Sequence, residues 1–351
     1  MTQPKNLLIV RTDRIGDVVL SLPIARIIKK YFPQCKVTFL LKEYTKCLAE
    51  QNPFIDKIIL LKEKDGKILI KENIKEISRH NFDSAIIVYP TFITSLIIFL
   101  SKIKFRIGTG YRWYSILFNQ KVYEHRKFAE KHELEFNVNL LKVFGINEKV
   151  DEENIQFDLT PTIESKNLID KFLIEENISS EKPIIVIHPG SGGSAVDWPI
   201  DNFQRLVKLI SAQMDSTIII TGNRNEISIC KQLEVSKEIK NFAGKFNLSE
   251  LIAMINKADL FISNSTGPLH IAAALGKYTV GFYPNILSCS PQRWGPYTKK
   301  KFIFTPQIQC SDCTREKCLK LDCMSSIKPE DVFDQINKVY QHILNNGELD
   351  V

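Results

Sequence analysis

The sequence has no run of apolar residues long enough to cross a membrane. The most apolar window, Phe92–Leu100, falls far below the roughly 20 residues that a spanning helix needs. No N-terminal segment combines a basic start with a long apolar centre, as a signal peptide would. We therefore expect a cytoplasmic protein.

Several nucleotide-binding signatures are also missing. The chain contains no Asp-x-Asp pair, no G-x-G-x-x-G dinucleotide fingerprint and no G-K-[ST] Walker loop. It also lacks a basic patch interleaved with aromatic residues, so we expect no nucleic-acid partner. The net charge of +7 is spread along the chain, which fits either a solvated surface or attraction to an anionic substrate or membrane.

What the chain does contain is a strand-helix alternation that occurs twice. A length of 351 residues suggests two domains. Fully apolar strands between amphipathic helices predict parallel sheets that are covered on both faces. The predicted strands are Leu7–Arg11, Lys36–Leu41, Ile58–Leu61, Ser84–Val88 and Arg106–Tyr111, and then Ile184–His188, Thr217–Thr221, Asn241–Ala243, Leu260–Ser263 and Tyr278–Phe282.

The predicted fold class is therefore α/β, with two doubly wound Rossmann-like domains in tandem. The polar stretch Asn147–Ser180 marks the link between them. We expect domains at 1–175 and 176–328, and a C-terminal helix within 329–351 that could pack back on the first domain. Ligands bind beyond the carboxyl ends of strands in such sheets, so a cleft between the domains is the expected active site.

The first predicted strand ends in a polar loop, Arg11–Asp17. Asp17 would lie at a helix entrance, where its carboxylate could accept a proton from a substrate hydroxyl. The alternative is a helix cap that satisfies free N–H groups. Asp13 is a second candidate base, while Arg11 and Arg14 could contact an anion or lie on the surface.

Strand Ile184–His188 is followed by a glycine-rich loop. Glycines allow the backbone to approach a ligand closely, and serine hydroxyls add donors. The residues concerned are Gly190, Ser191, Gly192 and Ser194. A tight loop without a ligand is an equally good explanation of this pattern. Trp198-Pro199 follows, and we expect it to pack over the next helix start.

A third segment, Leu260–Gly276, places a small polar turn between an apolar strand and an apolar helix. Free backbone N–H groups at a helix N-terminus favour an anion such as a phosphate. Thr266 and Gly267 are the residues best placed for this role. His270 could bond a phosphate or a ribose, or could be a structural histidine.

Taken together, these motifs resemble glycosyltransferase family 9, the lipopolysaccharide heptosyltransferase family. The resemblance extends over nearly the whole chain. It is carried by Leu8–Pro23, Gly108–Tyr111, His132–Gly145, His188–Pro199, Phe242–Leu248 and Ser265–Gly276. It implies a glycosyltransferase B fold, with an acceptor-binding N-terminal domain and a nucleotide-sugar-binding C-terminal domain. It further implies an inverting, metal-independent transfer, typically of heptose from ADP-heptose to the lipopolysaccharide core.

The resemblance also implies roles for particular residues. Asp17 corresponds to the family's catalytic base. Glu226 falls where the family often has an acidic residue near the donor nucleoside, and Ser265 lies beside Thr266 in the donor segment. Arg14 and Arg112 are the expected acceptor contacts. The implied acceptor is an anionic lipid-linked saccharide, so we also expect peripheral contact with the cytoplasmic face of the inner membrane.

The chain departs from the family pattern at two places. Ser265 stands where the family usually has Asp before the Thr-Gly pair. Val196-Asp197 replaces the Lys-Arg or Lys-His that often precedes Trp-Pro, which removes a cation expected near the donor phosphate. Lys245 is a candidate replacement for that charge. These departures suggest a variant donor, different phosphate contacts or reduced activity.

Four of the eight cysteines lie close together, at Cys310, Cys313, Cys318 and Cys323. Four thiolates could hold a structural zinc ion. The spacing differs from the strong C-x2-C…C-x2-C pattern, so free or disulfide-forming thiols are the alternative. No cofactor is expected to be required beyond the nucleotide-sugar donor.

Two other functional classes fit the same fold. One is a nucleotide-sugar epimerase or hydrolase, which would need no acceptor pocket. The other is a non-catalytic protein that binds nucleotide sugars, which Ser265 and Val196 would allow. Transfer that requires an acceptor would separate the transferase from both.

Overall fold

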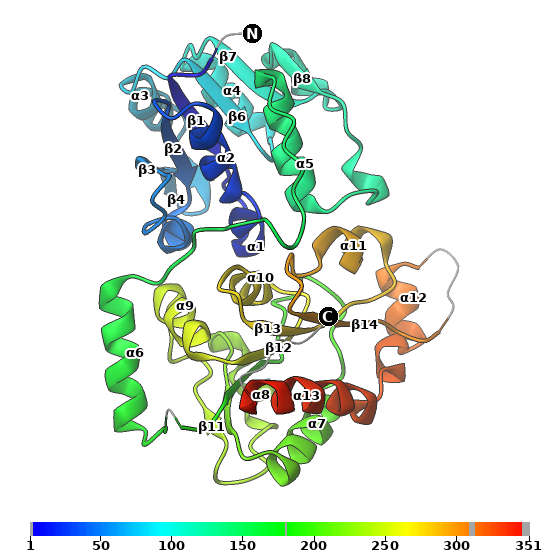
Figure 1. The fold of residues 1–351 in the computed structure, drawn as a ribbon. Coiled ribbons are helices and arrows are strands. Elements are labelled where there is room, and N and C mark those ends of the chain that lie inside the picture. The colour runs from blue at the N-terminus through cyan, green and yellow to red at the C-terminus, as the bar shows by residue number, and fades with distance from the viewer. Residues whose placement is uncertain (1–2, 180, 309–312, 346–351) are drawn as a thin grey trace. The chain divides into compact units, whose positions relative to one another are not determined.

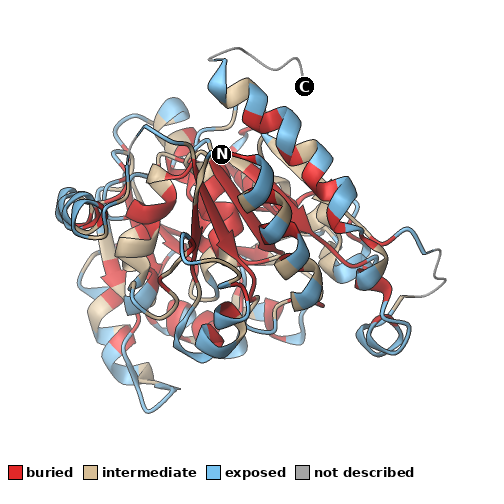
Figure 2. Ribbon diagram, turned by 90° about the horizontal axis from the view of Figure 1, so that it is seen from below, coloured by how far each residue is buried: buried red, intermediate tan, exposed pale blue. Residues whose placement is uncertain are grey.

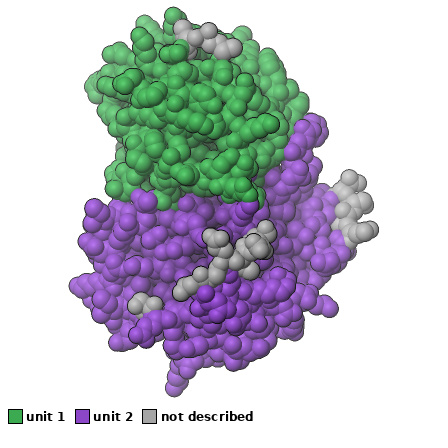
Figure 3. All heavy atoms as spheres, in the orientation of Figure 1, with its two compact units in different colours: residues 1–127, 131–159 green, residues 128–130, 160–351 purple. Residues whose placement is uncertain are grey.

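The computed structural model describes residues 3–179, 181–308 and 313–345, and the chain divides into two compact units. Unit 1 comprises residues 1–127 and 131–159, and unit 2 comprises residues 128–130 and 160–351 (Figure 3). Each unit contains one six-stranded sheet in which all neighbouring strands run parallel. The predicted α/β class with two doubly wound sheets is confirmed (Figure 1).

The sheet of unit 1 has the strand order β3-β2-β1-β6-β7-β8. Its central strand β1 is buried on both faces from Leu7 to Val10, because every side chain there is aliphatic. The six strands are β1 (Asn6–Val10), β2 (Lys36–Leu41), β3 (Lys57–Leu60), β6 (Ser84–Ile87), β7 (Phe105–Thr109) and β8 (Gln120–Val122).

Within residues 3–159, five α-helices connect or flank these strands: α1 (Ile15–Val19), α2 (Pro23–Tyr31), α3 (Ile70–Ser78), α4 (Phe92–Leu100) and α5 (Glu133–Asn139). Short 3₁₀ helices are η1 (Glu43–Leu48), η2 (Trp113–Leu117), η3 (Arg126–Phe128) and η4 (Leu140–Phe144). A small antiparallel hairpin joins β4 (Glu63–Lys64) to β5 (Lys67–Ile68). Asp65 and Gly66 form its two-residue turn with φ of +50° and +73°, the conformation that a tight hairpin requires.

Unit 2 repeats the same strand order, as β11-β10-β9-β12-β13-β14. Figure 2 shows its buried strands beneath helices whose outer turns are exposed. The strands are β9 (Ile184–His188), β10 (Thr217–Ile220), β11 (Lys240–Asn241), β12 (Leu260–Asn264), β13 (Tyr278–Phe282) and β14 (Lys301–Phe304).

The helices of unit 2 are α6 (Ile163–Glu175), α7 (Ile200–Gln213), α8 (Ile227–Lys231), α9 (Leu248–Lys257), α10 (Gly267–Ala274), α11 (Pro291–Trp294), α12 (Arg315–Lys320) and α13 (Pro329–Leu344). Its 3₁₀ helices are η5 (Arg224–Glu226), η6 (Leu287–Cys289) and η7 (Cys323–Ser326). As expected, Trp198 packs beside the start of α7, with its ring 4.8 Å from that of Phe203 and stacked on Phe282 at 4.1 Å.

The chain divides at Leu159, earlier than the boundary that we expected after residue 175. Helix α6 belongs to unit 2, where it packs against α9 and where the Phe172 ring contacts Phe242. Helix α13 packs on α7 of the same unit, and the Tyr340 hydroxyl donates to the Asp215 carbonyl over 3.1 Å. The polar segment before α6 is therefore the link between the units.

In each sheet, the direction in which successive strands are added reverses at the central strand. In unit 1, β1 lies between β2 and β6, and in unit 2, β9 lies between β10 and β12. Crossovers leave such a strand in opposite directions, which opens a crevice at its carboxyl end. The loops after β1, β9 and β12 are the three segments that the sequence singled out.

Candidate active site

The loop after β1 is organised around Arg11, whose side chain is completely buried. Its Nε donates to Asp13 Oδ1 over 2.8 Å, and a terminal nitrogen of the guanidinium donates to Asp17 Oδ1. The guanidinium also lies 3.7 Å from the buried Glu133 carboxylate and 3.4 Å from Asn137 Oδ1. The suggestion that Arg11 lies on the surface is therefore wrong, because these groups, two of them on α5, enclose it.

The carboxylates around Arg11 stand in an unusual electrostatic environment. Burial raises the pKa of Asp13 to about 6, an effect that Arg11 opposes and the neighbouring Asp17 reinforces. Burial lowers the Arg11 pKa, but the three carboxylates outweigh it and raise the pKa above its usual range, so the cation persists at every physiological pH. Arg11 is thus a fixed positive charge between acidic groups.

Asp17 lies in the first turn of α1 with about 15% of its side chain exposed. Arg11 holds its carboxylate, while the N-cap position of the helix belongs to Arg14. A carboxylate that is oriented by a buried cation and still reaches solvent can accept a proton from a bound hydroxyl.

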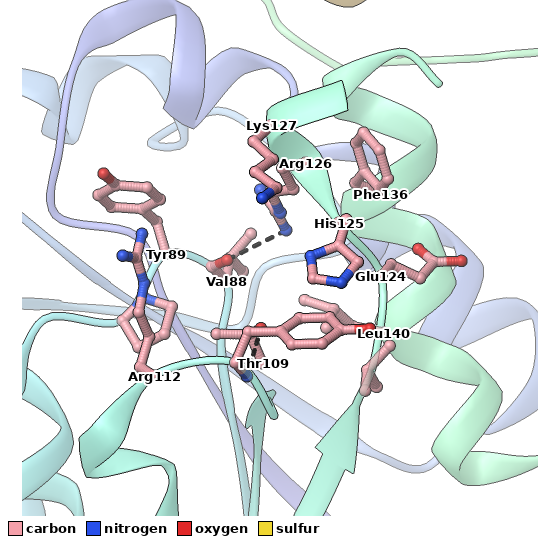
Figure 4. Close-up of a pocket in the computed structure, with 13 residues that line it drawn as sticks. Val88, Tyr89, Thr109, Arg112, Glu124, His125, Arg126, Lys127, Phe136 and Leu140 are labelled. Atoms are coloured by element: carbon pink, nitrogen blue, oxygen red, sulfur yellow. Dashed lines mark hydrogen bonds between the residues drawn. The ribbon is translucent and has the colours of Figure 1, made fainter. Parts of the chain in front are cut away.

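Unit 1 also contains a cavity of about 330 Å³, and the ring of Tyr89, which lines it, lies 5.9 Å from the Arg11 guanidinium (Figure 4). Tyr89 and Arg112 lie on one side of it, and His125 and Glu124 lie on the other. The His125 ring is stacked on Tyr111 with centroids 3.6 Å apart. Aromatic faces and cations in one cavity suit a sugar that carries anionic groups.

The structure separates the two arginines that we expected to contact an acceptor. Arg112 is exposed and lines the cavity. Arg14 is also exposed, but it lies at the N-cap of α1 and is not among the residues that line the cavity. Arg126 and Lys127 are cavity cations that the motifs did not single out, although they belong to a basic run in the sequence.

In unit 2, the Glu226 carboxylate accepts hydrogen bonds from the backbone of the glycine loop (Gly190–Ser194) and of a neighbouring segment. One carboxylate oxygen accepts the Gly192 N–H over 3.1 Å, and the other accepts the Asn223 N–H over 2.8 Å. A Cβ at position 190 would lie 2.1 Å from the same carboxylate, so only glycine fits there. Glu226 therefore shapes the loop, in addition to any contact with a ligand.

His188, at the end of β9, is a further buried polar residue at this position. Its Nδ1 lies 3.0 Å from the Thr221 hydroxyl, and its Nε2 lies 3.8 Å from Glu226. Burial lowers the pKa of His188, although Glu226 opposes the shift. The sequence signal for this residue is a histidine at the end of a fully apolar strand.

Two side chains tie the glycine loop to the loop after β12. Ser194 Oγ lies 2.9 Å from the Ser191 carbonyl and 2.7 Å from the Ser265 carbonyl. Asn264 donates to the Pro189 carbonyl over 2.6 Å and accepts the Trp198 N–H over 2.8 Å. The second and third sequence motifs thus form one connected polar site at the carboxyl ends of β9 and β12.

Helix α10 begins at Gly267. Thr266 is its N-cap, yet the Thr266 side chain makes no capping bond. Its hydroxyl is buried and has no hydrogen-bond partner among the residues that the structure describes. His270 is buried in the same first turn. The helix start therefore offers an uncommitted hydroxyl beside its backbone N–H groups, an arrangement that suits an anion.

The glycine loop is also contacted by a cation from a segment outside the sequence motifs. Arg315, the first residue of α12, donates to the Gly193 carbonyl over 3.1 Å, and its charge acts on the nearby Asp197 carboxylate. Asp197 is one of the two positions where a family cation is replaced. Lys245 pairs instead with Glu176 at 3.5 Å and lies over the rings of Phe172 and Phe242.

The cysteine cluster is only partly described. Cys310 lies outside the described residues, and Cys318 and Cys323 are buried in the core of unit 2. Within the described part of the chain, no group of three or more His, Cys, Asp or Glu residues could hold a metal ion. A zinc ion bound through Cys310 stays a prediction that metal analysis would test. Across the same residues, every helix is too short or too polar to span a membrane.

Comparison with known proteins identifies the relatives of this chain. Residues 70–323 match the family model of glycosyltransferase family 9 (heptosyltransferase). A protein of Haemophilus influenzae named as a glycosyltransferase is 31% identical over 86% of this chain and 89% of its own length. Lipopolysaccharide heptosyltransferase 1 of Campylobacter coli is 24% identical over 95% of this chain and 98% of its own length.

The fold agrees with these matches. The solved structure of the ADP-heptose LPS heptosyltransferase II of Escherichia coli superimposes with a TM-score of 0.78, at 18% identity, over 97% of this chain and 99% of that one. The fold is therefore of the glycosyltransferase B type. These matches decide between the enzyme classes that the sequence left open, in favour of a transferase over an epimerase or hydrolase. The chain belongs to glycosyltransferase family 9, the heptosyltransferase family.

Proposed function

We propose that this glycosyltransferase moves a heptose from ADP-heptose to the lipopolysaccharide core or a related cell-surface glycan, with inversion and without a metal ion. The single observation that carries the chemistry is Asp17, which the buried Arg11 orients. The donor and acceptor are suggested by the names of relatives, an ADP-heptose LPS heptosyltransferase and a lipopolysaccharide heptosyltransferase.

The proposed reaction is a single displacement in which Asp17 is the general base. Arg11 holds Oδ1, and Oδ2 takes the proton from the attacking acceptor hydroxyl. The hydroxyl oxygen bonds to the anomeric carbon while the bond from that carbon to the ADP phosphate oxygen breaks. Attack from the face opposite the leaving group inverts the anomeric centre, and ADP leaves with the bonding electron pair.

The polar site of unit 2 supports binding of the departing diphosphate. Thr266 supplies a buried hydroxyl at the N-terminus of α10, and Arg315 supplies a cation beside the glycine loop. Donors and charges that are already in place stabilise charge that develops on a leaving group without further reorganisation. We propose that Gly190, Ser191, Gly192, Ser194, Ser265, Gly267 and His270 complete this donor site, with Glu226 near the nucleoside.

The cavity of unit 1 supports an anionic saccharide as acceptor. Arg112, Arg126 and Lys127 supply positive charge there, and stacked rings supply faces for sugar C–H groups. An acceptor linked to lipid would require the enzyme to work at the cytoplasmic face of the inner membrane.

The test compares purified Asp17→Asn with wild type, using ADP-heptose and a lipopolysaccharide core acceptor. We expect transfer to fall by at least a factor of 10³ while ADP affinity is unchanged, and wild-type transfer to persist in EDTA. Asp201→Asn is the matched control, since Asp201 also lies in the first turn of a helix but is exposed on α7. Unchanged turnover by Asp17→Asn, with transfer lost in Asp13→Asn, would assign the base to Asp13.

A second arm of the test addresses the donor and the non-catalytic alternative. Incubation with a panel of nucleotide sugars should release nucleotide only with ADP-heptose and only when acceptor is present. Binding of ADP-heptose without turnover on any acceptor would contradict the proposed activity and favour a binding protein.

A further inference from the structure

Helix α4 of unit 1 presents an apolar face to solvent. Its exposed residues are Phe92, Ile93, Phe99 and Leu100, which are 39–44% exposed. They recur at helical spacing and therefore share one side of the helix. Thr94 and Ser95, the polar residues of this helix, are buried instead, in hydrogen bonds to the Thr91 cap. Ile97 and Ile98 fill the core side of α4, so the helix is apolar on its buried side and also on its exposed side, where an amphipathic helix would be polar.

The neighbouring 3₁₀ helix η2 extends this apolar face. Trp113 is 76% exposed and Ile116 is 80% exposed, yet the Trp113 ring lies 4.8 Å from that of Phe92. Arg106 fixes the other end, since its guanidinium lies 5.2 Å from the Phe99 ring and donates to the Leu117 carbonyl over 2.8 Å. These six apolar side chains form one patch, which we call the α4–η2 surface.

The segment of chain that forms the α4–η2 surface carries charge of a single sign, whereas α3, which packs against α4, carries Glu72 and Glu76 as well as Lys71 and Lys75. Residues 84–123 contain five Lys or Arg and no Asp or Glu, in a chain with 40 acidic residues. Lys102 and Lys104 are both exposed and follow α4 directly. Scattered exposed apolar residues are ordinary, but a contiguous patch with a basic rim marks an interaction site.

We propose that the α4–η2 surface docks this enzyme on an anionic lipid bilayer. Trp and Phe side chains enter the boundary between headgroups and acyl chains, while lysines extend their ammonium groups to lipid phosphates. The charge argues against a second copy of the chain as the occupant, because a two-fold contact would bring the same cations together. The proposal extends the lipid-linked acceptor proposed above, although its test measures binding alone.

The test is co-sedimentation of the full chain with vesicles. We expect binding to equimolar phosphatidylglycerol–phosphatidylcholine vesicles, and weak binding to pure phosphatidylcholine. Trp113→Ser/Ile116→Ser and Lys102→Gln/Lys104→Gln should each lower the bound fraction at least fivefold. All four side chains are exposed, so thermal unfolding should match wild type and exclude misfolding as the cause.

Matched controls come from exposed residues of unit 2. Ile163 and Ile174 on α6 are 74% and 76% exposed, so Ile163→Ser/Ile174→Ser removes equally exposed apolar groups. Lys208→Gln/Lys231→Gln removes two exposed charges. Both control proteins should bind vesicles as wild type does.

Three outcomes would overturn the proposal. They are absence of wild-type binding to anionic vesicles, equal loss in test and control variants, and self-association that Trp113→Ser/Ile116→Ser abolishes without any vesicle binding. A protein that binds vesicles through this surface but transfers no heptose would keep this inference and contradict the proposed function.

Discussion

The guanidinium of Arg11 and the carboxylate of Asp17 form a hydrogen-bonded ion pair in the loop that follows β1. The pair joins a side chain with no exposure to one that is about 15% exposed. A base is useful only if its carboxylate is held in place and still reaches the substrate. Arg11 meets the first condition, so we regard it as a positioning residue for Asp17.

Replacing Arg11 with Met should strongly destabilise unit 1. The change leaves Asp13 and Asp17 without the buried cation that pairs with both, while Glu133 keeps its ion pair with Arg126. Removing one partner of such a buried network costs about 3–5 kcal/mol of unfolding free energy. Urea unfolding of wild type and Arg11→Met measures the difference.

The control for Arg11→Met is Arg205→Met, which breaks an exposed ion pair with Glu330. That change should leave the unfolding free energy nearly unchanged, because both partners are solvated. Equal effects of the two substitutions would contradict the structural importance of Arg11. Arg11→Lys keeps the positive charge but loses the planar guanidinium with its several N–H donors. If Arg11 positions Asp17, this substitution should lower kcat by a larger factor than it changes KM.

The raised pKa of Asp13 gives the folded protein a defined pH dependence. Burial shifts this pKa from 3.8 to about 6, so the folded state binds the proton more tightly than the unfolded state does. The resulting stabilisation is complete below pH 3.8 and is lost as the pH rises through about 6. Asp13→Asn cannot titrate and lacks this dependence.

We therefore expect wild type to lose stability relative to Asp13→Asn between pH 4 and 7, by up to ~3 kcal/mol. Urea unfolding of both proteins at several pH values in this window gives the difference directly. Groups remote from the loop titrate alike in both proteins and cancel. A difference that is constant across the window, or that changes with the opposite sign, would contradict the raised pKa.

The sequence predicted most strands of the two sheets, because these strands are rich in apolar residues and alternate with amphipathic helices along the chain. It missed β8 and β14, which are short edge strands of mixed polarity. It also left the location of Arg11 open, because the burial of that side chain depends on Glu133 and Asn137, more than 120 residues away. The contact between Arg315 and the glycine loop could not be predicted for a similar reason, since Gly193 lies 122 residues away in the sequence.

Thr266→Val tests the donor site, because it should weaken ADP binding without lowering the stability of the free protein. The Thr266 hydroxyl is buried without a described partner and makes no cap bond, so its removal should leave the free protein equally stable or up to ~1 kcal/mol more stable. If the hydroxyl binds a phosphate oxygen, ADP affinity should fall about 5- to 20-fold. Thermal unfolding and calorimetric titration with ADP measure the two effects.

Thr279→Val, on β13 of the same unit, is the matched control for Thr266→Val. The Thr279 hydroxyl is bonded to the Lys300 carbonyl over 3.0 Å, so its loss should destabilise the protein by about 1 kcal/mol. ADP affinity should not change in this control. If Thr266→Val bound ADP as tightly as wild type, the α10 N-terminus would not hold the diphosphate through this hydroxyl.

Arg315→Gln tests whether α12 supplies the cation that Val196-Asp197 lacks. The wild-type guanidinium donates to the Gly193 carbonyl over 3.1 Å and acts on Asp197, so it stands where a donor phosphate would benefit from positive charge. Because Arg315 is exposed, Arg315→Gln should unfold as wild type does. KM for ADP-heptose should rise about tenfold, since a charge-assisted hydrogen bond contributes about 1.5–3 kcal/mol.

Arg315→Lys should recover part of this loss, whereas Lys320→Gln, at the other end of α12, should leave KM unchanged. An unchanged KM in Arg315→Gln would show that Arg315 only supports the loop, and the missing cation would then have to come from another segment of the chain.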